Sequence, residues 1–132
     1  MKNFIGICFL TVAFSSCDPT VSMEANIINQ TTQDLAVEFI SLDQNLNKTL
    51  EISNNNVKRF QEGFDVGNDF IEPYLIEYDS VVVKNSSEQI LKVYKPNDSG
   101  KNIFKIDAYW ISSEPSKNFF KYEYEITSED LE

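Results

Sequence analysis

The stretch FFKYEYEIT, residues 119–127, is the clearest strand in the chain and decides the fold class. Apolar and aromatic residues occupy its even-numbered positions, from Phe120 to Ile126, while Phe119 and three charged residues occupy most of the odd-numbered ones. An alternation with a period of two is typical of a β-strand that buries one face and exposes the other. We therefore expect residues 119–127 to form a half-buried strand.

Short segments of the same kind precede this stretch, separated by turn clusters rich in asparagine, aspartate, serine and glycine. Residues 21–29 alternate with the same period and residues 35–42 follow after a polar turn, so we expect these two strands to form a hairpin with a longer loop. Further strands are expected at residues 49–52, 57–60, 74–78, 80–84, 90–95 and 103–112. No segment carries the sustained 3.6-residue apolar period of an amphipathic helix.

Roughly seven to nine short strands, with turns every 8–12 residues, predict an all-β antiparallel sandwich. A domain of this size and strand number favours an immunoglobulin-like or transthyretin-like sandwich, and a small β-barrel is the alternative. We place this domain at residues 23–127 and expect residues 128–132 to form an acidic tail. The chain shows no internal repeat, and its length fits a single domain.

Residue usage excludes several classes of site. Histidine is absent, which removes Ser-His-Asp and Cys-His catalysis and the usual histidine metal sites. The oxygen-rich residues 65–69 lack the distal glutamate of a calcium loop, and the pairs Glu77 with Asp79 and Glu123 with Glu125 are typical of solvated strand surfaces. We therefore expect no enzymatic activity, no catalytic residue, no metal and no cofactor.

The first seventeen residues, MKNFIGICFLTVAFSSC, have the pattern of an export signal. Lys2 supplies a positive start, an apolar run of about eleven residues follows, and Ser15 and Ser16 are small residues that suit a cleavage site. The apolar run is well short of the roughly 20 residues that span a bilayer as a helix. We therefore expect residues 1–16 to be a cleaved signal peptide.

Cys17 directly follows the small residues of this signal, and the arrangement resembles the lipobox of bacterial lipoproteins. The resemblance implies that a diacylglyceryl group is attached to the thiol of Cys17, that the signal is cut before this residue, and that the new amino group is acylated. Phe14 and Ser16 depart from the commonest box, which has leucine and then glycine or alanine there, and resemble the relaxed boxes of Bacteroidetes-type bacteria. An ordinary signal peptide with an incidental cysteine, or a short buried helix, is the alternative.

Two or more acyl chains hold a protein stably on a membrane. The resemblance therefore implies a lipid-anchored protein of the bacterial cell envelope, with residues 17–22 as a lipidated tether. We expect the outer membrane, facing the periplasm or the exterior, and the alternative is the inner membrane, because Asp18 resembles an inner-membrane retention signal of some bacteria as well as the acidic residues that accompany surface export. The signal, the early strand with its polar turn and the tyrosine-rich last strand together resemble small uncharacterised lipoproteins of Bacteroidetes-type bacteria. That resemblance implies one site residue, Cys17.

The mature chain is strongly acidic. Cleavage after residue 16 leaves 116 of the 132 residues and removes Lys2 from the 11 basic residues, so that 21 acidic residues give a net charge of about −11. Such an excess disfavours nucleic acid and anionic lipid headgroups, which bind basic surfaces. Cys8 lies in the signal and Cys17 would carry lipid, so no disulfide is expected. The expected partners are the membrane, through the anchor, and another envelope protein or a glycan.

Three residues of the domain are candidate sites in addition to the lipidated cysteine. Tyr109 and Trp110 could stack on a sugar ring, but Trp110 shares the parity of the apolar residues in the expected strand 103–112 and is interpreted as a core residue. Ser80 lies in the triplet Asp-Ser-Val, which resembles the short O-glycosylation motif of exported proteins in Bacteroidetes-type bacteria, although a strand position would hide it.

The combined pattern predicts a non-enzymatic binding or scaffold module that lipid holds in the cell envelope. One alternative is an inhibitor or immunity-type lipoprotein whose acidic face binds a basic partner, which clustered charge of one sign would favour. Another alternative is a carbohydrate-binding envelope lipoprotein.

Overall fold

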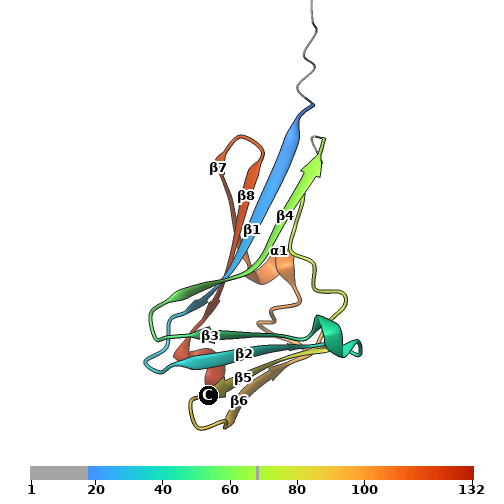
Figure 1. Cartoon of the computed structure of the whole chain (residues 1–132). Helices are drawn as coiled ribbons and strands as arrows, with labels where there is room; N and C mark the ends of the chain where they lie inside the picture. Colours follow the sequence, from blue (N-terminus) through green and yellow to red (C-terminus); the bar gives the residue numbers. More distant parts are fainter. Residues whose placement is uncertain (1–17, 68) are drawn as a thin grey trace, which may run out of the picture.

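Residues 18–67 and 69–132 are described by the computed structural model, and they fold into two four-stranded sheets that share one hydrophobic core (Figure 1). The elements in chain order are β1 (Thr20–Asn29), β2 (Leu35–Ile40), η1 (Gln44–Leu46), β3 (Lys48–Ile52), β4 (Val57–Val66), β5 (Ser80–Asn85), β6 (Ile90–Tyr94), α1 (Ile106–Tyr109), β7 (Ile111–Ser116), β8 (Phe119–Ile126) and η2 (Ser128–Leu131). The prediction of an all-β sandwich is confirmed, with two open sheets rather than the alternative small barrel. Cys17 and the expected signal peptide, residues 1–16, lie outside the described residues.

The first sheet has the strand order β4-β1-β8-β7, and the second sheet has the order β3-β2-β5-β6. Every pair is antiparallel except β1 with β8, which run parallel from Ser22 beside Phe119 to Asn29 beside Ile126. An immunoglobulin constant domain keeps its first two strands side by side in one sheet, whereas β1 and β2 lie in different sheets here. In Figure 1 the first sheet rises beyond the second, and β1 begins at the end opposite to the C-terminus.

Alternation along the strands builds the core between the sheets. In β1 every second residue from Val21 to Ile27 is buried, and in β8 the last three even-numbered residues, ending at Ile126, are buried. The alternation predicted for the last strand is therefore confirmed. Phe39 of β2 stacks on Phe60 of β4 with their ring centroids 4.2 Å apart, so an aromatic pair joins the two sheets.

The expected hairpin between the first two strands does not form, and that prediction is wrong. Both segments are strands, but β1 pairs with β4 and β8, while β2 pairs with β3 and β5. The polar turn between them crosses from one sheet to the other. The buried Asn29 holds this crossing, because its side-chain amide donates to the carbonyl oxygens of Gln33 at 2.8 Å and Ile52 at 2.9 Å. Alternation shows which face a strand buries, and it does not show which strand lies beside it.

Residues 103–112 do not form the expected strand, so that prediction is also wrong. Residues 106–109 form the helix α1 instead, and β7 follows it. The buried Asn102 turns the chain before this helix: its side-chain amide donates to the carbonyl oxygen of Lys95 at 2.7 Å, and its side-chain oxygen accepts from the N–H of Phe104 at 3.1 Å. These side-chain hydrogen bonds offer the backbone an alternative to a sheet ladder.

The segment between β4 and β5 also differs from expectation. β4 is longer than the expected strand 57–60, because it pairs with β1 from Val57 to Val66 with one bulge at Phe60. Residues 74–78 form no strand, and the N–H of Tyr78 donates to the carbonyl oxygen of Leu75 at 3.0 Å in a turn. Residues 74–78 therefore belong to neither sheet and form part of the surface beside them.

The two ends of the domain are more regular than expected. β1 begins at Thr20, inside the expected tether 17–22, and the N–H of Gly67 donates to the carbonyl oxygen of Pro19 at 2.6 Å. The chain is therefore fixed to the end of β4 from Pro19 onward. At the other end, the helix η2 takes up most of the expected acidic tail. Within the described part of the chain, no helix has the length and apolar character needed to cross a membrane.

Candidate functional site

A groove of about 550 Å³ lies outside both sheets, between the segment 72–78 and the segment 104–106. Its lining is mostly apolar and aromatic, and comprises Glu72, Pro73, Tyr74, Leu75, Ile76, Tyr78, Pro96, Phe104 and Ile106. We call these residues the aromatic groove. Open clefts with apolar walls and few polar groups are the usual form of a binding site.

The first wall of the aromatic groove is an ordered segment that presents apolar side chains to solvent. Leu75 is 4% exposed and belongs to the core, whereas its neighbours Tyr74 and Ile76 are 52% and 79% exposed. The N–H of Tyr74 donates to the side-chain oxygen of Gln61 on β4 at 2.7 Å, which ties the segment to the first sheet. Large apolar side chains that an ordered backbone holds in solvent mark surfaces that contact a partner.

The second wall is held by the buried side chains that turn the chain before α1. The indole N–H of Trp110 donates to the carbonyl oxygen of Ile103 at 2.7 Å. The Trp110 ring packs on Tyr124 of β8 with the ring centroids 5.5 Å apart. These contacts, together with the hydrogen bonds of Asn102, fix the backbone on both sides of Phe104 and leave its half-buried ring on the groove.

A second hollow of about 420 Å³ continues the aromatic groove toward α1. The two hollows share Glu72, Phe104 and Ile106, and the second adds Lys105, Asp107 and Ala108. Charge is therefore concentrated at this end of the groove. Burial and then the nearby carboxylates of Glu72 and Asp107 raise the pKa of Tyr122 to about 12.

The lining of the aromatic groove is mainly apolar and aromatic. Glu72 is the one carboxylate among its lining residues. Burial and then the charge of Glu77 raise the pKa of Tyr78, so its hydroxyl stays protonated at neutral pH. No group of three His, Cys, Asp or Glu side chains that could hold a metal ion occurs in residues 18–67 and 69–132. The groove therefore suits stacking on aromatic groups and burial of aliphatic ones.

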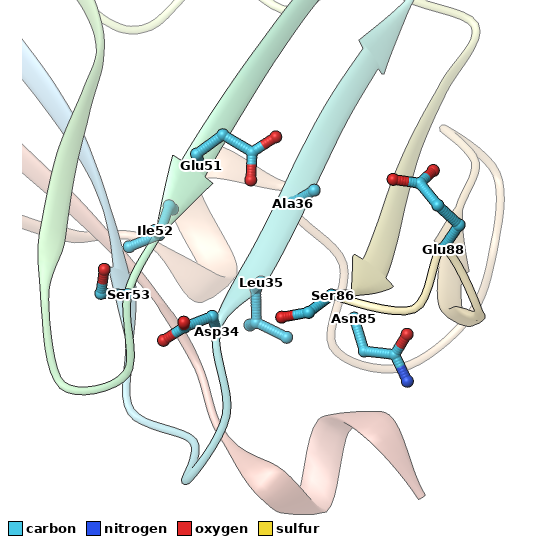
Figure 2. Close-up of a pocket in the computed structure, with 9 residues that line it drawn as sticks. All are labelled: Asp34, Leu35, Ala36, Glu51, Ile52, Ser53, Asn85, Ser86 and Glu88. Carbon is cyan, nitrogen blue, oxygen red and sulfur yellow. The ribbon is translucent and has the colours of Figure 1, made fainter.

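A smaller and more polar pocket of about 260 Å³ lies at the ends of β2, β3 and β5 (Figure 2). Figure 2 shows the side chains of Glu51 and Glu88 on opposite sides of this pocket. Two of its carboxylates already have partners, because Asp34 accepts from the N–H of Asn54 at 2.9 Å and Glu88 lies 3.8 Å from the ammonium of Lys84. We therefore assign these groups to turns and ion pairs, and we assign no ligand to the pocket.

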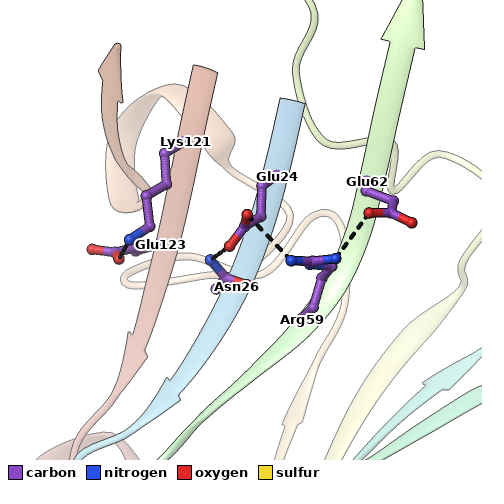
Figure 3. Close-up of polar contacts among 6 residues, drawn as sticks. All are labelled: Glu24, Asn26, Arg59, Glu62, Lys121 and Glu123. Carbon is purple, nitrogen blue, oxygen red and sulfur yellow. Dashed lines mark hydrogen bonds and ion pairs between the residues drawn. The ribbon is translucent and has the colours of Figure 1, made fainter. Parts of the chain in front are cut away.

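The outer face of the first sheet carries both signs of charge (Figure 3). Arg59 of β4 lies between Glu62 at 2.9 Å and Glu24 at 3.4 Å, and Lys121 pairs with Glu123 at 3.0 Å. The pairing of Lys121 with Glu123 agrees with a solvated strand surface. An acidic inhibitor needs charge of one sign clustered on its binding face, so this mixed surface weakens the inhibitor alternative.

The candidate residues from the sequence do not meet in one place. Trp110 is 6% exposed, so the prediction of a core residue is confirmed, but its ring reaches the core from the end of a short helix. Tyr109 is partly buried against the core, and neither ring lines the aromatic groove. Ser80 is the half-buried first residue of β5. Cys17, the expected lipidation site, lies outside the described residues.

Tyr74, Ile76 and Phe104 are the residues that sequence reasoning missed. The strands expected at 74–78 and 103–112 assigned them to sheet faces. A usable signal exists in the run Tyr74-Leu75-Ile76, because a half-buried strand turns only every second residue toward the core. Three consecutive large apolar residues therefore leave at least one in solvent, unless both faces of the strand are covered.

Comparison with known proteins finds no match to this chain among family models, curated proteins or solved structures.

Proposed function

We propose that the protein is a lipid-anchored envelope protein that binds another envelope protein through the aromatic groove and catalyses no reaction. The observation that supports this proposal most directly is the pair Tyr74 and Ile76, which are 52% and 79% exposed. The buried Leu75 and the hydrogen bond from the N–H of Tyr74 to the side chain of Gln61 hold this wall in place. Buried aromatic and aliphatic anchors supply most of the energy of protein interfaces.

The chemistry of the aromatic groove favours a protein partner over a glycan. Flat aromatic faces stack on sugar rings, but Ile76 places a branched aliphatic side chain beside Tyr74 at the open side of the groove. An apolar side chain of a partner can fill such a site and release its water. Glu72 at the charged end, and the acidic net charge of the whole chain, favour a partner with lysine or arginine next to that apolar side chain.

The lipobox-like residues before Cys17 support the anchored half of the proposal. A lipid anchor confines the protein and an envelope partner to one membrane surface, which raises their effective concentration. A groove of moderate size can then serve a partner that it would bind only weakly in solution.

Site-specific photo-cross-linking in cells tests the groove. A photoreactive residue in place of Ile76 should form an adduct with one envelope protein, and the same residue in place of Tyr74 should form the same adduct. Ile90 is the matched control, because it is 58% exposed but pairs with Lys84, at the end of β5 remote from the groove. Adducts of equal yield from Ile76 and Ile90, or no adduct from Ile76, would count against the groove.

The anchor has a separate test. The full chain and its Cys17→Ala variant are expressed with a fatty-acid analogue, and the cells are fractionated. We expect label and membrane association in the first protein and neither in the variant. Label on both proteins or on neither would overturn the anchor.

A glycan array probed with the same protein tests the carbohydrate alternative. Glycan binding that Ile76→Asn abolishes would show that the ligand of the groove is a sugar and not a protein.

A further inference from the structure

The end of the first sheet where β1 begins carries an apolar patch on its outer face. Ser22 of β1 lies in register between Phe64 of β4 and Phe119 of β8. In the preceding row, Thr20 pairs with Val66. Phe64 is 69% exposed and Val66 is 60% exposed. Because serine is small, a hollow of about 380 Å³ lined by both phenylalanine rings opens above it. We call Phe64, Val66 and Phe119 the apolar patch.

Polar rows separate the apolar patch from the rest of this face. The next rows along the same strands pair Glu24 with Glu62 and Asn26 with Arg59, and Figure 3 shows these polar side chains on the same face. Beyond them Ile28 pairs with Val57 at the other end of β4. A cluster of large exposed apolar side chains next to such polar rows marks a contact surface.

Covalent geometry places this end of the sheet close to the expected anchor. Two residues, Asp18 and Pro19, separate Cys17 from Thr20, so the Cα atoms of Cys17 and Thr20 lie at most roughly 11 Å apart. The N–H of Gly67 donates to the carbonyl oxygen of Pro19 at 2.6 Å, so the chain is already fixed to the first sheet at Pro19, two residues after Cys17. A headgroup layer is roughly 5–8 Å thick on each side of the hydrocarbon. An anchored Cys17 therefore leaves no room for another protein domain between the bilayer and the start of β1.

We propose that Phe64, Val66 and Phe119 lie in the interfacial layer of the same bilayer that holds the lipid on Cys17. The inference rests on the proposed lipid anchor. Aromatic side chains are favoured at the membrane interface, and apolar area buried there adds to binding. The occupant is the surface of uncharged or zwitterionic lipids, because the acidic net charge of the chain disfavours anionic headgroups.

This arrangement orients the domain. The apolar patch lies at the end where β1 begins, whereas the C-terminus lies at the opposite end of the molecule (Figure 1). Contact through the apolar patch therefore turns the second sheet, including the pocket at the ends of β2 and β3, away from the membrane.

Tryptophan fluorescence in vesicles tests the apolar patch. The full chain, purified with its lipid, is placed in phosphatidylcholine vesicles that contain lipids brominated near the headgroup, which quench tryptophan on contact. Phe64→Trp introduces a reporter on the apolar patch, and Val57→Trp introduces one on the same strand and face at the other end. Trp110 is buried and supplies the same background in both proteins. We expect a loss of emission with Phe64→Trp that exceeds the loss with Val57→Trp.

Each outcome decides the proposal. Fatty-acid label and flotation with the vesicles are measured on the same samples. A labelled, floating protein that is quenched equally at both positions overturns the membrane contact of the apolar patch and leaves the anchor intact. A protein that neither carries the label nor floats with the vesicles overturns both the anchor and the membrane contact. A blue shift of Phe64→Trp without bromine quenching shows that protein, such as a second copy, covers the apolar patch, and this also overturns the proposal. Equal thermal unfolding of both variants confirms that their folds are unchanged.

Discussion

The side-chain amide of Asn29 donates a hydrogen bond to the backbone carbonyl oxygen of Ile52 across 2.9 Å, and this bond joins the end of β1 in one sheet to the end of β3 in the other. A second hydrogen bond from the same amide reaches the carbonyl oxygen of Gln33 at 2.8 Å. The side-chain oxygen accepts from the N–H and the hydroxyl of Thr31 at 2.9 Å and 2.7 Å. Asn29 is fully buried, and every polar group of its side chain has a partner at the crossing between the sheets.

Replacement of Asn29 is expected to destabilise the sandwich. Asn29→Ala removes four hydrogen bonds and takes this partner from the N–H of Thr31 and the carbonyl oxygen of Ile52 in a buried place, whereas the hydroxyl of Thr31 keeps the carbonyl oxygen of Gln33 at 3.0 Å. The free energy of unfolding should fall by about 2–4 kcal/mol. Urea titration followed by the fluorescence of Trp110 measures this value. Asn97→Ala in an exposed turn is the control and should stay within about 0.5 kcal/mol of the wild type. Equal losses in the two variants would contradict the role of Asn29.

The turn after Asn29 shows which features of the fold the sequence predicts and which it does not. Alternation predicted the strand faces, including the buried positions of β8, because a residue's environment depends on its parity within the strand. The same turn cluster after Asn29 fits a hairpin or a crossing between sheets, and contacts with distant parts of the chain, such as the hydrogen bond to Ile52, separate the two. The groove was missed for a similar reason, since Asn102 and Trp110 bend the chain through contacts that leave no periodic trace.

Acid should destabilise the C-terminal end of the domain through Asp130. Its carboxylate lies 2.6 Å from the ammonium of Lys101 and accepts from the N–H of Thr127 at 2.8 Å. Burial alone would raise the pKa of Asp130, but the hydrogen bonds from Lys101 and Thr127 outweigh burial and hold the pKa below its ordinary value. A lowered pKa in the folded state gives stability that is present above the unfolded pKa and is lost as the pH falls through the folded one.

We therefore expect the free energy of unfolding to decrease when the pH is lowered below about 4. Asp130→Asn should remove the part of that decrease which Asp130 causes. Urea titrations at pH 7 and pH 3 measure the difference. Asp130→Asn should lower stability at pH 7 and lower it less at pH 3. The exposed neighbour provides the control, since Glu129→Gln should keep the acid dependence of the wild type. An unchanged acid dependence in Asp130→Asn would show that other carboxylates cause it.

Alkali should destabilise the fold through Tyr122. Its hydroxyl is buried and has no hydrogen-bond partner within the described residues. Burial and then Glu72 and Asp107 raise its pKa from 10.0 to about 12. A raised pKa gives stability that is present below the unfolded pKa and is lost as the pH rises through the folded one. We therefore expect the free energy of unfolding to fall between pH 10 and pH 12, the two limits set by these pKa values.

Tyr122→Phe should reduce this alkaline loss and leave stability at pH 7 nearly unchanged, because the ring remains and no hydrogen bond within the described chain is lost. Tyr94 and Tyr124, whose pKa values burial also raises, should keep part of the loss in every variant. Urea titration at pH 7, 10 and 11.5 gives the comparison, with Tyr74→Phe at a half-exposed site as the control. A large loss of stability at pH 7 in Tyr122→Phe would reveal a partner for the hydroxyl.

Leu75 and Ile76 are neighbours in sequence with opposite surroundings, and this contrast separates stability from binding. Leu75 is 4% exposed, so Leu75→Ala should lower the free energy of unfolding by about 2–4 kcal/mol through a lost contact and a cavity. Ile76 is 79% exposed, so Ile76→Asn should change that free energy by less than about 0.5 kcal/mol. Urea titration measures both values.

The same pair decides what the aromatic groove is for. If the groove binds an envelope protein, Ile76→Asn should abolish the adduct formed by a photoreactive residue at position 74, although the protein stays folded. If the exposed wall instead packs within the protein in solution, Ile76→Asn should destabilise the fold nearly as much as Leu75→Ala. A stable Ile76→Asn protein with full adduct yield would exclude both roles, because an apolar anchor cannot be exchanged for a polar amide at no cost to either folding or contact.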